Sequence, residues 1–402
     1  MNNKRKEELL PAGNLMKQEM ITFLSQNQSI LKNLCTFLYD NPEESYKEFK
    51  SSSYICDLLT KYSFKVTSNY LDIPSSFYAV KGTGHPKICY LCEYDAIANE
   101  GHLTGHNALT TMSIGASILL GSIINKTGGS VVVIGCPGEY LGGTKNIMVK
   151  QKSFEDIDVV MECHPDIVTA ESGTSSSIIP LSIKYTNEST FSFLSRNKYT
   201  SLDAMLLIFN IVNNIKKGLP KDVEINSIIS SGGSTPLFTP SECEAKFYIR
   251  AKNTKMVEVA EEKIRKTAAF ISEVTDIPHT ISLYEPPSEN LITNRTLNRL
   301  FSHNLKENGV ISINSPANVF SGLSIGAVSK VVPAIHPYIS IIEQEGINYG
   351  SKEFLKATQS SFAFEQMKKA SLALAFTGMD LIHNNNLLNE IRNEFYKDIE
   401  QE

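Results

Sequence analysis

The sequence of 402 residues lacks a long hydrophobic run, because no stretch reaches the ~18 uninterrupted apolar residues that a membrane-spanning helix needs. It also lacks an excess of one charge sign, since 38 Lys and Arg stand against 43 Asp and Glu, a formal charge of −5. These absences predict a protein that neither spans a membrane nor binds nucleic acid. Residues 1–8 carry both signs of charge and precede no apolar core with a cleavage site, so we expect a cytoplasmic location.

A disulfide framework is also absent, because the seven cysteines are odd in number and thinly spread. Cys89 and Cys92 form a CxxC, but they lie in the apolar run 88–92 and no second pair completes a zinc site. We therefore interpret them as buried thiols of a strand.

The length favours two domains, or one large domain with an insertion. Up to about Gly173 the pattern alternates strand and helix, as in an α/β layer. The runs 87–92, 130–135 and 157–163 are predicted strands, and the last two are buried, as in the middle of a helix-covered sheet. Helical spacing predicts helices over 14–39, from about 41 to 62, and over 106–124.

Beyond residue 173 the pattern changes to βαββαβ, the order of a ferredoxin-like unit. Helices over 292–308 and 363–382 then flank an apolar run, 327–333, taken as a strand. Because these helices have no strands of their own to cover, we expect one α/β domain made of 1–177 and 288–402, with 178–287 inserted. The inserted elements are predicted at 179–185, 201–217, 223–230, 245–251, 255–273 and 279–284.

Polar residues follow several predicted strands, at the places where open α/β sheets bind their ligands. Imidazole is a common zinc ligand, and a carboxylate beside a metal can act as general base. The candidates are His106, His164 and His336 as ligands, with Glu139 as the base. Asp95 could orient His106, or it could cap a helix.

The motifs resemble those of the M20 metallopeptidase family, in its amidohydrolase branch, which contains p-aminobenzoyl-glutamate hydrolase subunits and related dipeptidases. The resemblance runs almost end to end. The matching segments are Asn41-Pro42-Glu43-Glu44, Leu91-Cys92-Glu93-Tyr94-Asp95-Ala96, Gly105-His106-Asn107, Cys136-Pro137-Gly138-Glu139, His164-Pro165, Tyr248-Ile249-Arg250-Ala251 and Val332-Pro333-Ala334-Ile335-His336-Pro337.

The resemblance implies a zinc-aminopeptidase-like catalytic domain, a mixed sheet with helices on both faces, that holds two divalent metal ions. It also implies that the inserted ferredoxin-like domain acts as a lid and dimerises. The branch binds its metals through a Cys, a Glu and three His, uses a second Glu as general base, and hydrolyses amides of amino acids.

Several positions depart from that pattern. Thr104 stands where the Cys ligand is expected, and Tyr140 replaces the Glu ligand beside the base, Glu139. The resemblance also implies a lid His that donates to the substrate oxyanion, and Thr190 stands at its position here. Arg250 matches an Arg that could bind a substrate carboxylate. Because both anionic ligands are missing, we expect the site to hold one divalent ion, Zn²⁺ or Mn²⁺, or none.

Three functions remain open. The first is hydrolysis of dipeptides or N-acyl amino acids by an altered, single-metal or weak active site. The second is a catalytically inactive homologue that binds an amino-acid conjugate or peptide. In the third, the chain is the partner subunit of an intact paralogue, so that it forms a heterodimer, rather than a homodimer, through the lid.

Overall fold

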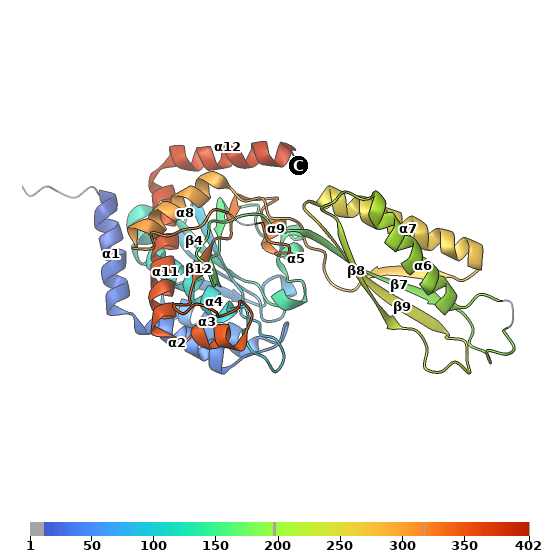
Figure 1. Ribbon diagram of the computed structural model, residues 1–402. Helices are drawn as coiled ribbons and strands as arrows, with labels where there is room; N and C mark the ends of the chain where they lie inside the picture. Colours follow the sequence, from blue (N-terminus) through green and yellow to red (C-terminus); the bar gives the residue numbers. More distant parts are fainter. Residues whose placement is uncertain (1–11, 196–197, 317, 402) are drawn as a thin grey trace, which may run out of the picture. The chain divides into compact units, whose positions relative to one another are not determined.

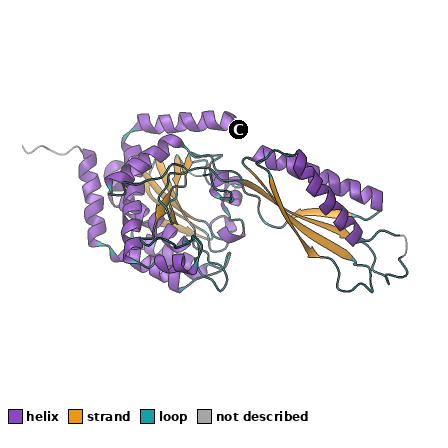
Figure 2. Cartoon of the chain, in the orientation of Figure 1, coloured by secondary structure: helices purple, strands orange, loops and turns teal. Residues whose placement is uncertain are grey.

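The computed structural model describes residues 12–195, 198–316 and 318–401 (Figure 1). The chain forms two compact units. The first contains residues 1–173, 292–317 and 328–402, and the second contains residues 174–291 and 318–327. The α/β fold and the inserted ferredoxin-like domain are both as predicted. Helices lie around the strands of the first unit and along one face of the strands of the second (Figure 2).

A mixed six-stranded sheet forms the centre of the first unit, in the order β1-β2-β4-β3-β5-β11. The strands β4, β3, β5 and β11 pair parallel with one another in that order, whereas β2 pairs antiparallel with both β1 and β4. The side chains of β4 are all buried, as the apolar run predicted. The strands are β1 (Lys65–Ser68), β2 (Phe77–Thr83), β3 (Lys87–Cys92), β4 (Gly129–Gly135), β5 (Val159–Met161) and β11 (Ala334–Ile335), with a separate parallel pair, β6 (His164–Asp166) and β12 (Tyr338–Ser340).

The helix α4 (His106–Thr127) is the central helix of this unit and packs against β3, β4 and α11. It is long and apolar enough to cross a membrane, but 94% of its most apolar window is buried inside the protein, which is typical of a core helix. The other helices are α1 (Ala12–Gln26), α2 (Ser29–Asp40), α3 (Phe49–Lys61), α5 (Lys145–Lys150), α8 (Arg295–Glu307), α9 (Ile325–Val328), α10 (Lys352–Ala357), α11 (Ser361–His383) and α12 (Asn385–Gln401).

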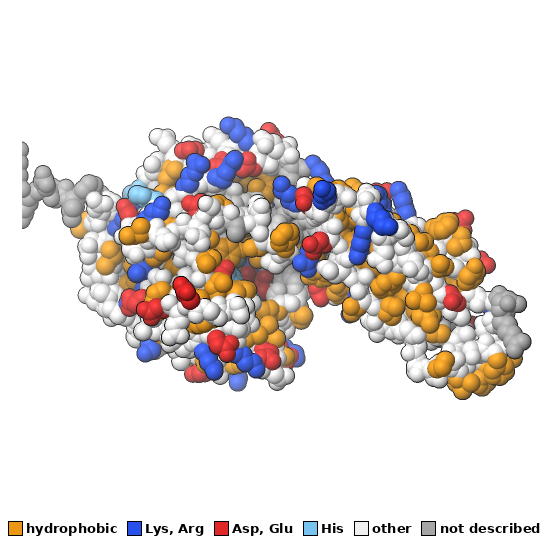
Figure 3. Space-filling model, viewed as in Figure 1, with side chains coloured by type: hydrophobic (Ala, Val, Ile, Leu, Met, Phe, Trp, Pro, Cys, Tyr) orange, Lys and Arg blue, Asp and Glu red, His pale blue; other side chains and the backbone are white. Residues whose placement is uncertain are grey.

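The second unit has the order βαββαβ and a four-stranded antiparallel sheet, β10-β7-β9-β8. A capping box between Thr200 and Asp203 starts its first helix. Hydrophobic side chains such as Phe193 and Leu194 gather, exposed, on the loops at one end of this unit (Figure 3). The elements are β7 (Ser177–Thr186), α6 (Ser201–Ile215), β8 (Glu224–Ser231), β9 (Glu242–Ala251), α7 (Thr254–Thr275) and β10 (His279–Leu283).

Some local predictions were wrong. The helix expected over 14–39 is divided into α1 and α2, and the one expected from residue 41 begins only at Phe49. The run 327–333, taken as a strand, contains a helix end and turns, and the strand follows at Ala334. All seven cysteines are free and buried, as expected for Cys89 and Cys92.

Gly135, at the end of β4, lies where the core leaves no room for a side chain. A Cβ added there would lie 2.2 Å from Cε1 of Phe77 and 2.7 Å from the hydroxyl of Tyr94. We expect Gly135→Val to lower the free energy of unfolding by about 1–3 kcal/mol, because the ring cannot move without repacking the core. Urea denaturation measures this change. Gly13→Ala, where nothing lies within 4 Å of the added atom, is the control that should lose no stability.

Candidate active site

Three buried side chains of the first unit come together as a possible metal site. Glu93 follows β3, His106 begins α4, and His164 begins β6. One ligand atom from each lies within 4.8 Å of the others. Two imidazoles and one carboxylate are the ligand set of several catalytic zinc sites that keep an open position. The residues present therefore fit one divalent ion.

Hydrogen bonds fix the orientation of both imidazoles. His106 places Nδ1 at 2.8 Å from Oδ1 of Asp95, which leaves Nε2 toward Glu93, at 3.3 Å from Oε2. His164 places Nδ1 at 2.8 Å from the carbonyl oxygen of Pro165. Metal-binding histidines usually donate their second ring N–H to a carboxylate or carbonyl in this way. Asp95 therefore lies where a residue that orients His106 is expected, and the cap position of α4 is Gly105.

His336 lies beside this group but has a different carboxylate partner. Its ring centroid is 5.4 Å from that of His164, and its Nε2 lies 3.3 Å from Oε1 of Glu162. Its Nδ1 is buried and has no hydrogen-bond partner among the described residues. The three predicted histidines thus lie together, although the close group contains Glu93 instead of His336.

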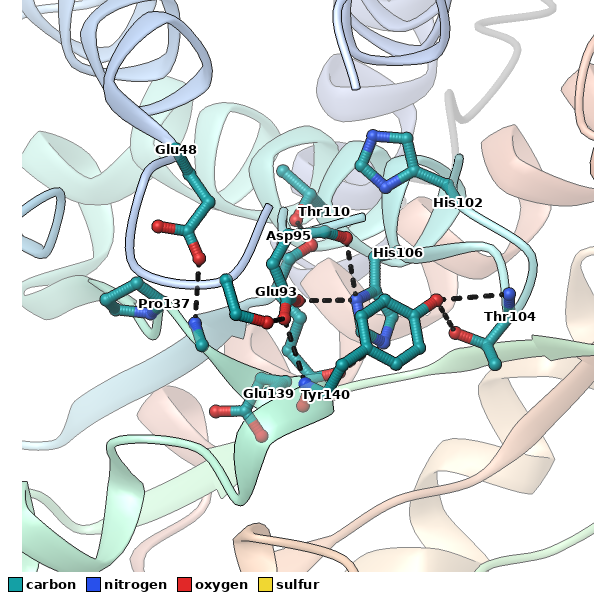
Figure 4. Close-up of polar contacts among 12 residues, drawn as sticks. Glu48, Glu93, Asp95, His102, Thr104, His106, Thr110, Pro137, Glu139 and Tyr140 are labelled. Atoms are coloured by element: carbon teal, nitrogen blue, oxygen red, sulfur yellow. Dashed lines mark hydrogen bonds and ion pairs between the residues drawn. The ribbon is translucent and has the colours of Figure 1, made fainter. Parts of the chain in front are cut away.

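Thr104 and Tyr140, at the two positions that lack the expected ligands, contact each other. The Thr104 hydroxyl and the Tyr140 hydroxyl are 2.5 Å apart, and the Thr104 backbone N–H also donates to the phenol at 3.3 Å. The Tyr140 ring stacks on His106 with centroids 4.5 Å apart (Figure 4). The two hydroxyl groups thus bond to each other where the resemblance implies a thiolate and a carboxylate ligand.

Glu139 lies on a short 3-10 turn, η2 (Glu139–Leu141), that a buried carboxylate holds in place. Glu48 accepts hydrogen bonds from the backbone N–H of Gly138 and from the hydroxyl of Ser75, at 2.8 and 2.7 Å. Gly138 has φ +79°, and an added Cβ would lie 2.4 Å from the ring of Tyr46. In Figure 4 the side chains of Glu139 and Tyr140 point away from each other. The turn therefore separates the predicted base from the Thr104–Tyr140 pair.

A buried lysine joins the carboxylates of the site. Lys145 begins α5, and its ammonium pairs with Oε1 of Glu93, with Oε1 of Glu139 at 3.2 Å and with Oε2 of Glu162 at 3.8 Å. Its side chain has no exposed surface. Glu93, Glu162 and Lys145 were not predicted as site residues. A usable signal was present, because Glu93 and Glu162 each come directly after one of two parallel strands that pair with each other.

These carboxylates correct the expectation of a site without anionic groups. Burial alone would raise the pKa of Glu93, but Lys145 and His106 outweigh it and lower the pKa to about 2. For Glu162, burial outweighs the attraction of Lys145, and with Glu93 and Glu139 nearby the pKa rises to about 8. One carboxyl of the group therefore keeps its proton at neutral pH while Glu93 is ionised.

The imidazoles also differ in charge. Burial lowers the pKa of His164 to about 4 and that of His336 to about 3, so both are neutral and can bind a metal ion at pH 7. Burial disfavours the charged form of His106 too, but Tyr140, Asp95 and Glu93 outweigh it and raise the pKa of His106 well above its usual value. His106 therefore has to release a proton when an ion binds.

Arg250 and Thr190 belong to the second unit. Arg250 donates to the carbonyl oxygen of Phe320 at 3.2 Å, and its guanidinium lies 5.4 Å from the ring centroid of Tyr248. It lines a cavity of about 220 Å³ together with Glu224. Thr190 exchanges hydrogen bonds with Thr239 through its backbone, which ties together the two loops at the end of that unit.

The whole sequence is similar to those of known dipeptidases and of a hydrolase subunit. Residues of this chain match the mouse Xaa-Arg dipeptidase with 29% identity over 329 residues, 79% of this chain and 75% of the relative. The human Xaa-Arg dipeptidase matches with 27% identity over 418 residues, 96% of this chain and 94% of the relative. A p-aminobenzoyl-glutamate hydrolase subunit from Escherichia coli is 27% identical over 71% of this chain and 63% of its own length. These relatives support the assignment of the chain to the M20 peptidase family.

Solved structures agree with this assignment at the level of the fold. An aminobenzoyl-glutamate utilization protein from Klebsiella pneumoniae has a TM-score of 0.69 at 11% identity, and covers 92% of this chain and 98% of that one. A dinuclear metal-binding peptidase of the M20 family from Bacillus subtilis has a TM-score of 0.63 at 16% identity, with 86% and 97% covered. No family model matches the sequence. The relatives of similar sequence named above are, by their names, dipeptidases and a hydrolase subunit.

The raised pKa of Glu162 predicts how stability depends on pH. Its pKa rises from 4.5 to about 8 in the folded state, so the folded protein binds a proton that the unfolded chain has lost. This contribution is complete below pH 4.5 and is lost as the pH rises toward 8. In a buffer with a chelator, which keeps metal ions off the protein, the free energy of unfolding should fall across this pH range by at most about 1.4 kcal/mol per pH unit. Denaturant titrations at several pH values measure the slope.

Glu162→Gln imitates the protonated carboxyl, so it should remove most of that slope. Glu353→Gln, on the exposed surface of α10, is the matched control and should keep the wild-type slope. An unchanged slope in Glu162→Gln would show that Glu162 is not the group that carries the proton.

Proposed function

We propose that this chain hydrolyses the amide bond of dipeptides or N-acyl amino acids with a single divalent ion held by Glu93, His106 and His164. The observation that carries the proposal is the convergence of these three ligands within 4.8 Å in a buried site. Each imidazole has its other ring nitrogen engaged, so Nε2 is directed to the ion. The composition favours Zn²⁺.

An ion in such a site supplies Lewis acidity and makes a water molecule acidic enough to attack near neutral pH. The chain supplies the proton transfers. Glu139 is the carboxylate that accepts the proton of the attacking water and delivers it to the leaving amine. The ammonium of Lys145, 3.2 Å away, pairs with Glu139 and helps to hold it in place. The Nδ1 of His336, which has no hydrogen-bond partner among the described residues, offers a polar contact to the substrate.

The proposed substrate class follows from the relatives. Xaa-Arg dipeptidases and a p-aminobenzoyl-glutamate hydrolase subunit both take an amide that leaves a free amino acid. Arg250 is the residue we assign to a substrate carboxylate, because a guanidinium binds carboxylates bidentately. Thr190 replaces the expected oxyanion donor, which lowers the rate by on the order of 10² to 10³. We therefore propose a slow hydrolase.

The test is hydrolysis of Xaa-Arg dipeptides and p-aminobenzoyl-glutamate by the metal-loaded protein, measured as the amount of free amino acid released. We expect activity that a chelator abolishes. Glu139→Gln should retain the ion but lose activity at least about 10²-fold, since a general base contributes that much. His106→Ala should lose both ion and activity. His303→Ala, on the exposed side of α8, is the matched control and should retain both. Activity that survives the chelator or Glu139→Gln would contradict the proposal.

The second candidate is a non-catalytic binding protein or partner subunit, and the Thr104–Tyr140 contact is the observation that favours it. The stacked Tyr140 ring and the 2.5 Å hydrogen bond fill the side of His106 where the resemblance implies anionic ligands. In this case the chain binds the amino-acid conjugate without cleaving it.

Restoring the two ligands separates the candidates. We expect Thr104→Cys with Tyr140→Glu to raise the hydrolysis rate at least about tenfold over the parent, because thiolate and carboxylate ligands strengthen ion binding. The rate and the ion content are measured on the same preparations, with Thr104→Ser and Tyr140→Phe as the control that adds no anion. A parent that binds the dipeptide without cleaving it, and a double variant that gains cleavage, would favour the binding protein.

A further inference from the structure

The ammonium of Lys145 lies where three carboxyl groups from separate segments converge. Glu93 comes from the end of β3, Glu139 from the η2 turn and Glu162 from the end of β5. All three side chains are at most 9% exposed, and that of Lys145 is fully buried. Buried carboxylates need a cation nearby, because desolvation costs several kcal/mol for each unpaired charge.

Protein sites commonly meet this need with divalent ions, because a dication pairs with several carboxylates at once. Glu93, His106 and His164 form a ligand group for one such ion. Glu139 and Glu162, outside that group, each lie within 3.8 Å of the Lys145 ammonium. A position where carboxylates could attract a second ion is thus already held by a cation of the chain itself.

We propose that Lys145 is a built-in cation that takes the place of a second metal ion, so that the site accepts one divalent ion and excludes another. The tethered ammonium pairs with Glu139 at 3.2 Å and lies 3.8 Å from Glu162, and its charge repels a dication from the space between them. This goes beyond the proposed function, because it concerns how many ions the site holds and does not require that an amide is cleaved.

Lys145 also positions the ligand group. The two oxygens of Glu93 face different partners, since Oε1 pairs with the ammonium and Oε2 lies 3.3 Å from Nε2 of His106. The lysine therefore holds Glu93 with one oxygen turned toward the imidazole. A continuous chain of contacts runs from Lys145 through Glu93 and His106 to Asp95, whose Oδ1 is 2.8 Å from Nδ1 of His106.

Lys145→Met tests the proposal, because methionine keeps the unbranched shape of the side chain and removes its charge. Apo protein is dialysed against Zn²⁺ or Mn²⁺ at a fixed free concentration, and bound ions are counted by mass spectrometry. We expect Lys145→Met to bind about one more ion per chain than the parent. Addition of the ion should also raise the melting temperature of the variant by more than it raises that of the parent. Lys152→Met, at an exposed position, is the matched control and should bind as many ions as the parent.

A second variant shows where the extra ion binds. Adding Glu162→Gln to Lys145→Met removes one of the carboxylates, so the ion count should return to that of the parent. If Lys145→Met does not fold as apo protein, circular dichroism during ion addition becomes the readout, and recovery of the fold on addition of Zn²⁺ or Mn²⁺ is the expected result.

The proposal is overturned if folded Lys145→Met binds no more ions than the parent, or if an unfolded variant is not recovered by either ion. The result stays separate from the proposed function. A parent that holds one ion but cleaves no amide would contradict the function and leave the role of Lys145 intact. An active parent whose Lys145→Met variant gains no ion would support the proposed function and contradict the role of Lys145.

Discussion

Charge balance among buried carboxylates is the constraint on which this site depends. Glu93 and Glu162 lie at the ends of neighbouring parallel strands, and Glu139 lies on the adjacent η2 turn. Without a cation each ionised carboxylate would cost several kcal/mol, so the ammonium of Lys145 is as much part of the fold as of the site. Even with it, burial leaves Glu162 protonated at neutral pH, with its pKa raised to about 8.

The carboxyl groups of this site do not lie at the two anionic ligand positions that the resemblance implies. At those positions Thr104 and Tyr140 bond to each other, whereas Glu93 faces His106 and Glu162 faces His336. Loss of two anionic positions therefore does not leave the cavity without carboxyl groups. Glu93 and Glu162 enter from the strand ends, and Glu93 pairs with a lysine.

Much of the fold follows from local pattern. The buried strand 130–135 and the βαββαβ order of the second unit were predicted because a strand that is apolar on both faces and the alternation of elements both leave a clear trace in the sequence. The break between α1 and α2 and the turns of residues 327–333 were not predicted. Apolar residues are buried in helix, strand and turn alike, so hydrophobic pattern alone does not separate the three in short segments.

The sequence by itself determined the family, the α/β class, the candidates His106, His164 and His336, and the substitutions at positions 104 and 140. Only the tertiary structure decided which of these side chains meet, because the parallel pairing of β3 with β5 brings Glu93 and Glu162 to one edge of the sheet. It also decided that Lys145 is buried between them, although a lysine is rarely fully buried and nothing in its neighbouring sequence marks it. The physical reason is that electrostatic partners are chosen by distance in space, and residues far apart in the chain acquire that distance only when the strands pair.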